Sequence, residues 1–322
     1  MQPLTGQFGT MNFPLQRIMG AFCAAAIALS GSACGSEMPQ GAPPAAQETP
    51  ASVEGAREGH PALWKVADDD TTIYLFGTIH ALPGKTQWFN PAIASALGSA
   101  DELVTEIDLA DAGALQTGLM QKSLLPRGQN LRDLMSDDDR LAYEKALAAL
   151  GLPSEAFDRF KPWYAGLMLS MLPVLKSGYS SDAGVEKVLD AHRAPKTRTG
   201  ALETAEFQLN LFDSMPMQEQ LSYLRSSVDA APEMVAMLDE MVVEWLDGDA
   251  EELADLMNEQ ADDPALMERL LYSRNRTWAG WIAKRLDRPG TVFLAVGAGH
   301  LAGTGSVQDV LAQHGIVSDR IQ

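Results

Sequence analysis

The chain has 322 residues, of which 46% are hydrophobic, and a formal net charge of −19. This composition is ordinary for a globular protein and sufficient for a sizeable core, which excludes disorder of the whole chain. An acidic chain without clustered Lys or Arg is repelled by phosphate groups, so we expect no nucleic-acid partner.

The chain begins with the features of an export signal. A single basic residue, Arg17, precedes an apolar run of about a dozen residues, which is too short to span a bilayer comfortably. Small residues then lead to Cys34, which fits either ordinary signal-peptidase cleavage or a bacterial lipoprotein site lipidated at Cys34. We expect residues 1–34 to be a signal peptide, possibly of lipoprotein type, and the protein to be periplasmic or lipid-anchored to a bacterial membrane. Both cysteines fall within this segment, which excludes thiol catalysis and Cys-ligated zinc from the domain behind it.

A tether and the first strands of a domain follow the export segment. Residues 35–60 are rich in Pro, Ala and Glu and lack apolar periodicity, which is typical of a disordered, solvated tether. Residues 61–322 are expected to form one domain. Residues 63–66 and 72–76, on either side of a polar turn, read as two strands, and residues 103–107 as a third.

A helical block separates these strands from a fourth one near the other end of the chain. Residues 136–151, 232–248 and 263–286 each show capping or breaking signals at the ends of a helix. Residues 291–296 carry apolar side chains at both odd and even positions, as expected for a strand covered on both faces. The predicted fold is α/β: a central mixed β-sheet built from both chain ends, with a large helical block inserted between them and packed around it.

A short repeat ends two of the predicted strands. The motif Gly-x-x-His runs from Gly77 to His80 after one strand, and from Gly297 through Gly299 to His300 after another. Ligand sites in open α/β sheets gather where strands give way to loops, and glycine there lets the backbone turn tightly and approach a ligand. One copy alone is weak evidence, since most such histidines are surface or packing residues. Two copies at strand ends predict a shared site.

Three charged residues are placed where a charge needs an explanation. Glu106 lies late in an apolar strand, where an acid costs free energy unless it is paired or binds a metal; the alternative is an edge-strand acid that faces water. Arg274 falls on an apolar helix face, so it either pairs with Glu106, Glu203 or bound substrate, or snorkels to the surface. Glu203 opens a predicted helix, where an acid is favourable for the helix dipole alone.

These motifs together resemble the TraB/PrgY/GumN family, which includes the animal Tiki proteins. The resemblance covers residues 61 to about 318 and follows the order of the family's motifs. The residues on which the resemblance rests are Trp64, Phe76 to His80 with Leu82-Pro83, Glu106-Ile107-Asp108, Lys161-Pro162-Trp163, Gly184-Val185, Leu202-Glu203-Thr204 with Gln208, Arg274-Asn275, and Val296 to Leu301 with Gly303. One departure is Glu186, which stands where many members carry Asp, so the resemblance assigns no role to that position.

The resemblance implies a metal-dependent peptidase. It implies His80, Glu106 and His300 as ligands of a divalent metal ion, for which Mn, Co and Zn all suit mixed nitrogen and oxygen donors. Three protein ligands would leave a coordination position for a water that attacks an amide or ester carbonyl. Chemistry and family order then assign Glu203 as general base and Arg274 as the group that stabilises the developing oxyanion. Asn275, adjacent to Arg274, is placed in the same catalytic group.

The sequence is compatible with two other functions. The chain could sequester a peptide or small ligand at the same pocket without turnover, or it could carry haem or a metal, because family fold alone does not determine the chemistry. The expected partner is thus a peptide or small molecule, with membrane contact only through the signal or lipid anchor.

Overall fold

The computed structural model describes residues 58–258 and 263–322. The predicted export segment, residues 1–34, and residues 35–57 of the predicted tether lie outside this part of the chain. Within it, no helix combines the length and the apolar character that crossing a membrane requires.

The last residues of the predicted tether contact the domain. Gly59 N donates to the Gln87 carbonyl oxygen at 2.7 Å, and His60 N donates to the Leu246 carbonyl oxygen at 2.6 Å. Residues 58–60 are therefore held against the domain by backbone hydrogen bonds.

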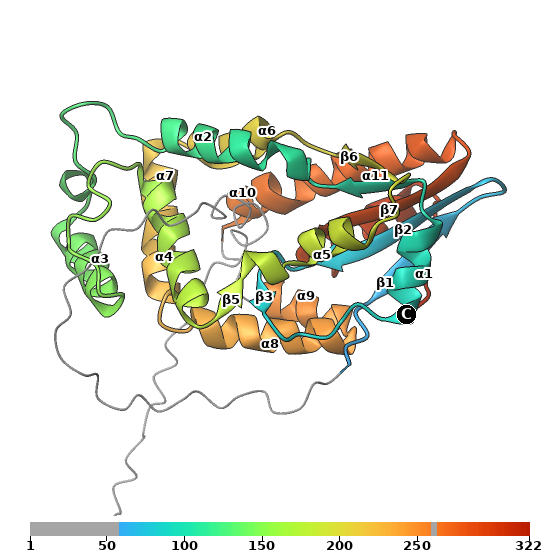
Figure 1. Cartoon of the computed structure of the whole chain (residues 1–322). Coiled ribbons are helices and arrows are strands. Elements are labelled where there is room, and N and C mark those ends of the chain that lie inside the picture. Colours follow the sequence, from blue (N-terminus) through green and yellow to red (C-terminus); the bar gives the residue numbers. More distant parts are fainter. Residues whose placement is uncertain (1–57, 259–262) are drawn as a thin grey trace, which may run out of the picture.

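A mixed sheet combines strands from both ends of the described chain, in the order β6-β4-β7-β2-β1-β8. Figure 1 shows the blue strands β1 and β2 beside the red strand β7. Strands β2, β7, β4 and β6 run parallel, whereas β1 is antiparallel to its neighbours β2 and β8. The bounds are β1 Leu63–Ala67, β2 Thr71–Thr78, β4 Glu102–Thr105, β6 Arg198–Ala201, β7 Gly290–Gly297 and β8 Asp319–Arg320, with β3 Leu82–Pro83 and β5 Tyr179–Ser180 in a separate pair.

The helical block lies between β4 and β7 in sequence; part of it extends away from the sheet, and other helices of the block pack against the sheet (Figure 1). The predicted fold class, a mixed sheet from both chain ends with helices inserted and packed around it, is confirmed. Helix α1 (Pro91–Ser99) precedes β4, and α12 (Val307–Gln313) follows β7. The block contains α2 Ala112–Lys122, α3 Asp137–Ala149, α4 Pro162–Lys176, α5 Val185–His192, α6 Ala205–Asp213, α7 Met217–Ala230, α8 Met234–Asp247, α9 Ala250–Asn258, α10 Pro264–Met267, η5 Glu268–Tyr272 and α11 Ser273–Leu286.

The three helices with predicted boundaries are all present. The Ser136 hydroxyl accepts a hydrogen bond from a backbone N–H in the first turn of α3, as an N-cap does. Gly248 ends α8 with a left-handed φ of 71°, which glycine adopts without a steric penalty. The helix predicted over residues 263–286 runs through α10, η5 and α11, but η5 is a π-helical turn that the sequence does not indicate. This turn ends just before Arg274, and such turns are frequent at functional sites.

Strand β7 carries apolar side chains on both faces because both faces are covered. On one face Phe293 and Ala295 pack into a cluster that includes residues of α1 and α8. On the other face Val292 and Leu294 pack into a cluster with residues of α11 and α12. The central position of β7, between β4 and β2, therefore explains the pattern that predicted a strand buried on both sides.

Candidate active site at the carboxyl ends of the parallel strands

The two Gly-x-x-His motifs lie side by side where β2 and β7 end. The strands pair in parallel with Thr78 opposite Gly297, so both segments leave the sheet at the same edge, and η6 (Ala298–His300) continues β7. A Cβ added at Gly77 would lie 3.0 Å from the Cα of Ala298, a separation that real Cβ atoms rarely show. The predicted meeting of the two strand ends is confirmed, and this close approach is a physical reason for glycine at position 77.

Each of the four parallel strands delivers a polar side chain to this edge. His80 and His300 follow β2 and β7, while Glu106 follows β4 and Glu203 follows β6. The ladder between β4 and β6 continues past the strand ends, because Glu203 N donates to the Glu106 carbonyl oxygen at 2.8 Å. This is the edge of an open α/β sheet at which ligand sites are usually found.

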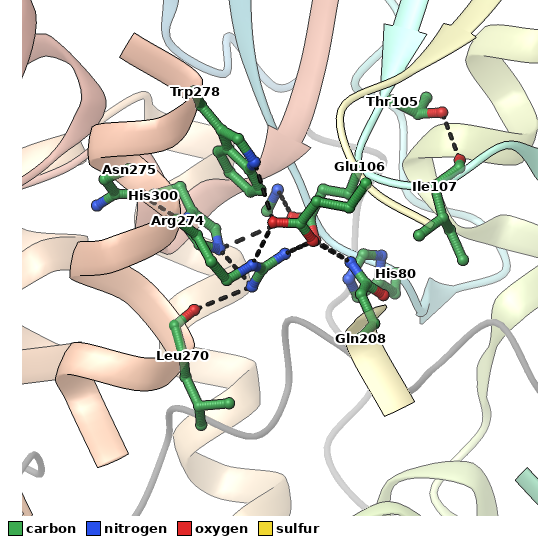
Figure 2. Close-up of polar contacts among 12 residues, drawn as sticks. His80, Thr105, Glu106, Ile107, Gln208, Leu270, Arg274, Asn275, Trp278 and His300 are labelled. Carbon is green, nitrogen blue, oxygen red and sulfur yellow. Dashed lines mark hydrogen bonds and ion pairs between the residues drawn. The ribbon is translucent and has the colours of Figure 1, made fainter. Parts of the chain in front are cut away.

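Glu106 is buried and accepts hydrogen bonds on both carboxylate oxygens. Oε2 accepts from Arg274 Nη2 at 2.5 Å and from Gln208 Nε2 at 2.9 Å, and Oε1 accepts from Gly297 N at 2.8 Å. Figure 2 shows Glu106 pointing towards Arg274 in the middle of the cluster. The possibility that Glu106 faces water is therefore wrong, and pairing provides the compensation that a buried acid requires.

Arg274 is only 2% exposed and is held by two carboxylates. Its Nε and Nη2 donate to the two oxygens of Glu203 at 2.8 and 2.9 Å, its Nη1 donates to the Leu270 carbonyl oxygen, and its guanidinium lies 4.7 Å from the centre of the Trp278 ring. Burial opposes the charge, but attraction by Glu106 and hydrogen bonds to Glu203 outweigh it and raise the pKa of Arg274. Arg274 is thus a buried, paired cation, and it does not snorkel.

His300 is fully buried, and both of its ring nitrogens have partners. Nδ1 lies 2.5 Å from Asn275 Oδ1, and Nε2 lies 3.1 Å from Arg274 Nη1. Asn275 Nδ2 donates to the Gly305 carbonyl oxygen at 2.7 Å, which turns Oδ1 towards the ring and assigns the imidazole proton to Nδ1. Burial above all, and then the charges of Arg274 and His80, lower the pKa of His300 well below its usual value. The ring is therefore neutral, with Nε2 as an acceptor.

His80 pairs with Glu186, a residue for which we predicted no role. Its Nδ1 lies 2.6 Å from Glu186 Oε1. Burial alone would raise the pKa of Glu186, but the charge and hydrogen bond of His80, together with a hydrogen bond from Thr78, lower it. A Cβ at Gly184 would overlap the His80 carbonyl oxygen, so glycine allows α5 to begin against the end of β2. In the sequence, the only indication of this partner is that an acid follows Gly184-Val185.

Other family motif residues support the cluster or lie apart from it. Gln208 bridges the carboxylates of Glu106 and Glu203, at 2.9 and 3.1 Å from its Nε2. Trp278 Nε1 donates to Glu203 Oε1 at 3.0 Å, so both Glu203 oxygens are engaged. Lys161 instead pairs with an aspartate at the end of α6, and this ion pair joins α4 to α6.

The predicted metal ligands have suitable donor atoms, but in this structure Glu106 and His300 contact Arg274, and His80 pairs with Glu186. Among residues 58–258 and 263–322, no three or more His, Cys, Asp or Glu side chains gather as a metal site. His300 Nε2 and Glu106 Oε1 are 3.9 Å apart, within the span of about 4.2 Å that two donors on one ion can have. Both imidazoles have Nδ1 on a side-chain oxygen, the support that ligating histidines usually have. The donor chemistry fits, provided that Arg274 releases His300 Nε2 and Glu106 Oε2.

Residues 62–320 match the model of the TraB/PrgY/gumN family, and the chain belongs to this family. Metalloprotease TIKI1 of Danio rerio is 27% identical across 84% of this chain and 66% of its own length. The uncharacterised protein YbaP of Escherichia coli is 22% identical across 81% of this chain and 96% of its own length, and an uncharacterised protein of Treponema pallidum is 22% identical across 77% and 79%. No solved structure gives a match. Relatives named as metalloproteases make hydrolysis a possible activity within the family.

Proposed function

We propose that this chain is an exported, metal-dependent hydrolase that cleaves a peptide amide bond, or an ester, at the carboxyl ends of β2, β4, β6 and β7. The observation that carries the proposal is the pair of motif histidines on adjacent parallel strands, each with Nδ1 held by a side-chain oxygen. The names of the TIKI relatives support the same class of reaction. Export, to the periplasm or to a membrane through a lipid anchor at Cys34, rests on the sequence of residues 1–34.

His80, His300 and Glu106 would hold the ion, with Mn, Co and Zn as the candidates. When bound, the metal supplies a Lewis acid that polarises a carbonyl group and lowers the pKa of a water. Asn275 fixes the His300 ring through Nδ1, so that its Nε2 retains its lone pair, and Glu186 holds Nδ1 of His80, whose Nε2 carries a lone pair when the ring is neutral.

The charge of the cluster favours a cation. Glu106, Glu186 and Glu203 contribute three negative charges and Arg274 one positive charge, which leaves −2 with neutral imidazoles and −1 if His80 carries a proton. Buried, uncompensated negative charge is costly, and a divalent ion would offset it.

Arg274 and Glu203 form the part of the site that would contact the anionic oxygen. Arg274 remains charged at any working pH because its pKa is raised. Glu203 binds its Nε and Nη2 together, which fixes the plane of the guanidinium. We propose that Arg274 donates to the developing oxyanion while Glu203 orients it. A general-base role of Glu203 stays a prediction, because both of its oxygens accept hydrogen bonds from Arg274 and its neighbours.

Metal content and peptide hydrolysis, measured together, test this function. The full chain is stripped with a chelator, reloaded with Mn²⁺, Co²⁺ or Zn²⁺, and assayed on a fluorogenic peptide library. We expect hydrolysis that needs the ion and is lost in the His80→Ala, His300→Ala double variant. His192→Ala is the matched control, because His192 is exposed and its ring packs against Phe89.

Each alternative gives a different result in this assay. Loaded wild type that binds peptides but hydrolyses none would identify a sequestering protein. Wild type that hydrolyses peptides equally well after chelation would contradict the requirement for a metal ion. A haem absorption band in the purified protein, with neither metal-dependent hydrolysis nor peptide binding, would favour a carrier.

A further inference from the structure

A pocket lies directly beside the two motifs. Its lining includes residues 78–81 of the first motif segment, residues 297–299 of the second, and side chains from α4, α8 and α9. Its cavity volume is about 60 Å³, several times what a single buried water requires. Protein interiors are close-packed, so a gap of this size next to candidate catalytic residues is a feature to explain.

The wall that the helices contribute is almost entirely apolar. No Asp, Glu, Lys or Arg is found among the lining residues in the described part of the chain. The polar lining residue of the helices, Ser170, donates its hydroxyl to the Gly166 carbonyl oxygen within α4. A charged group that entered would lose its hydration without gaining a partner, whereas an apolar group would lose only contact with water. The apolar side chains that matter here are Met171, Val174, Leu238, Met241, Leu253 and Met257.

The mouth of the pocket is at the motifs. Apart from Leu175, the lining residues that keep partial exposure all belong to the two motif segments, namely Ile79, His80, Ala81 and Gly299. A peptide that crossed His80 would therefore have the pocket next to the bond presented to the cluster. Methionine side chains in the wall are flexible and adapt to ligands of different shape.

We propose that this pocket binds one large apolar side chain of a peptide substrate, such as Leu, Met or Phe, adjacent to the bond that is cleaved. The position of the pocket next to a cleaved bond rests on the proposed function, whereas the binding preference does not depend on turnover. The pocket thus selects apolar over charged and small residues at one substrate position.

Binding and cleavage of matched peptides test the preference. The probes are fluorescein-labelled octapeptides of Gly and Ser in which a single Leu, Phe or Asp is moved along the chain. Anisotropy with the full-chain protein measures binding, and mass spectrometry measures cleavage. We expect Leu or Phe at one position to bind at least about 10-fold more tightly than Ser or Asp there. Equal binding of the Asp or Ser peptide, or no binding of any apolar peptide, overturns the proposal.

Substitutions at Val174 separate the pocket from general stability. Val174→Ala enlarges the pocket and should shift the preference from Leu towards Phe by about 10-fold, while Val174→Phe should abolish the advantage of Leu. Val242→Ala is the matched control, since Val242 is buried in the same hydrophobic cluster but does not line the pocket. An unchanged Leu-to-Phe ratio in Val174→Ala overturns the proposal, even if Val174→Phe fails to fold.

The two proposals fail in distinguishable ways. If no peptide is cleaved but the apolar preference persists and changes in the Val174 variants, the proposed hydrolase function is wrong and the proposed role of the pocket holds. If peptides are cleaved without any apolar preference, the proposed role of the pocket is wrong and the proposed hydrolase function holds.

Discussion

The two histidine motifs have the same local pattern but different surroundings. His300 is fully buried, and its Nδ1 contacts the neutral amide of Asn275. His80 lies at the mouth of the apolar pocket, and its Nδ1 contacts the charged carboxylate of Glu186. The repeat places both rings at one sheet edge, while the helices that pack there, α11 and α5, supply different partners.

This difference indicates that the two rings have different tasks. His300 is held as a neutral tautomer beside Arg274. A histidine that donates the lone pair of its Nε2 needs this tautomer. His80 is the ring that a molecule in the pocket can reach. We therefore expect the buried half of the site, around His300 and Arg274, to respond to substitution differently from the pocket half, around His80 and Glu186.

The largest effect is expected for Arg274→Met, which damages the buried half. It leaves Glu106 and Glu203 buried without their cation, and breaking one partner of a buried ion pair costs about 3–5 kcal/mol. Urea unfolding measures the loss. Adding Glu106→Gln and Glu203→Gln to this variant should recover part of the stability. A loss below about 1 kcal/mol would show that the buried charge network contributes little.

A pH dependence of stability is expected from His300. Its pKa is lowered in the folded protein, whereas the unfolded ring takes up a proton near pH 6.5. The unfolded state then binds more protons, so the free energy of unfolding should fall as pH drops below about 6.5, by up to about 1.4 kcal/mol per pH unit. His300→Gln should flatten this slope, and His192→Gln should keep it. An unchanged slope in His300→Gln would assign the effect to other groups.

A smaller loss is expected when His300 loses its anchor. Asn275→Ala leaves the ring N–H and the Gly305 carbonyl oxygen without their shared partner, which costs about 1–3 kcal/mol. Thermal unfolding measures this, and the variant should also show altered metal affinity, because the tautomer of His300 is no longer fixed. Stability equal to wild type would mean that water replaces the amide.

The smallest stability effect is expected at the pocket half. Glu186→Gln keeps the size of the side chain and removes its charge. Because the pKa of Glu186 is lowered on folding, its contribution is present above the ordinary carboxyl pKa of about 4.3 and lost as pH falls towards the folded value. Wild type and variant should therefore converge in stability below about pH 4. A stability difference that is the same at every pH would contradict the His80–Glu186 ion pair.

The sequence predicted the strands and the meeting of the motifs, because apolar runs define β1, β2, β4 and β7 and parallel strand ends share one edge. It also named Glu106 and Glu203 as candidate partners of Arg274, because a buried guanidinium needs an anion. It could not predict that Glu186 would pair with His80, since that contact depends on how α5 docks at Gly184. The pocket was equally inaccessible to prediction, because its wall joins α4, α8 and α9 from distant parts of the chain.

The most direct test of the account is whether His80 and His300 bind the same ion. Co²⁺ added to the stripped protein should give visible absorption that reports nitrogen coordination. We predict that this absorption is lost in His80→Ala and also in His300→Ala, and that it is retained in His192→Ala. Absorption that persists unchanged in both single variants would contradict a shared metal site at the two motifs.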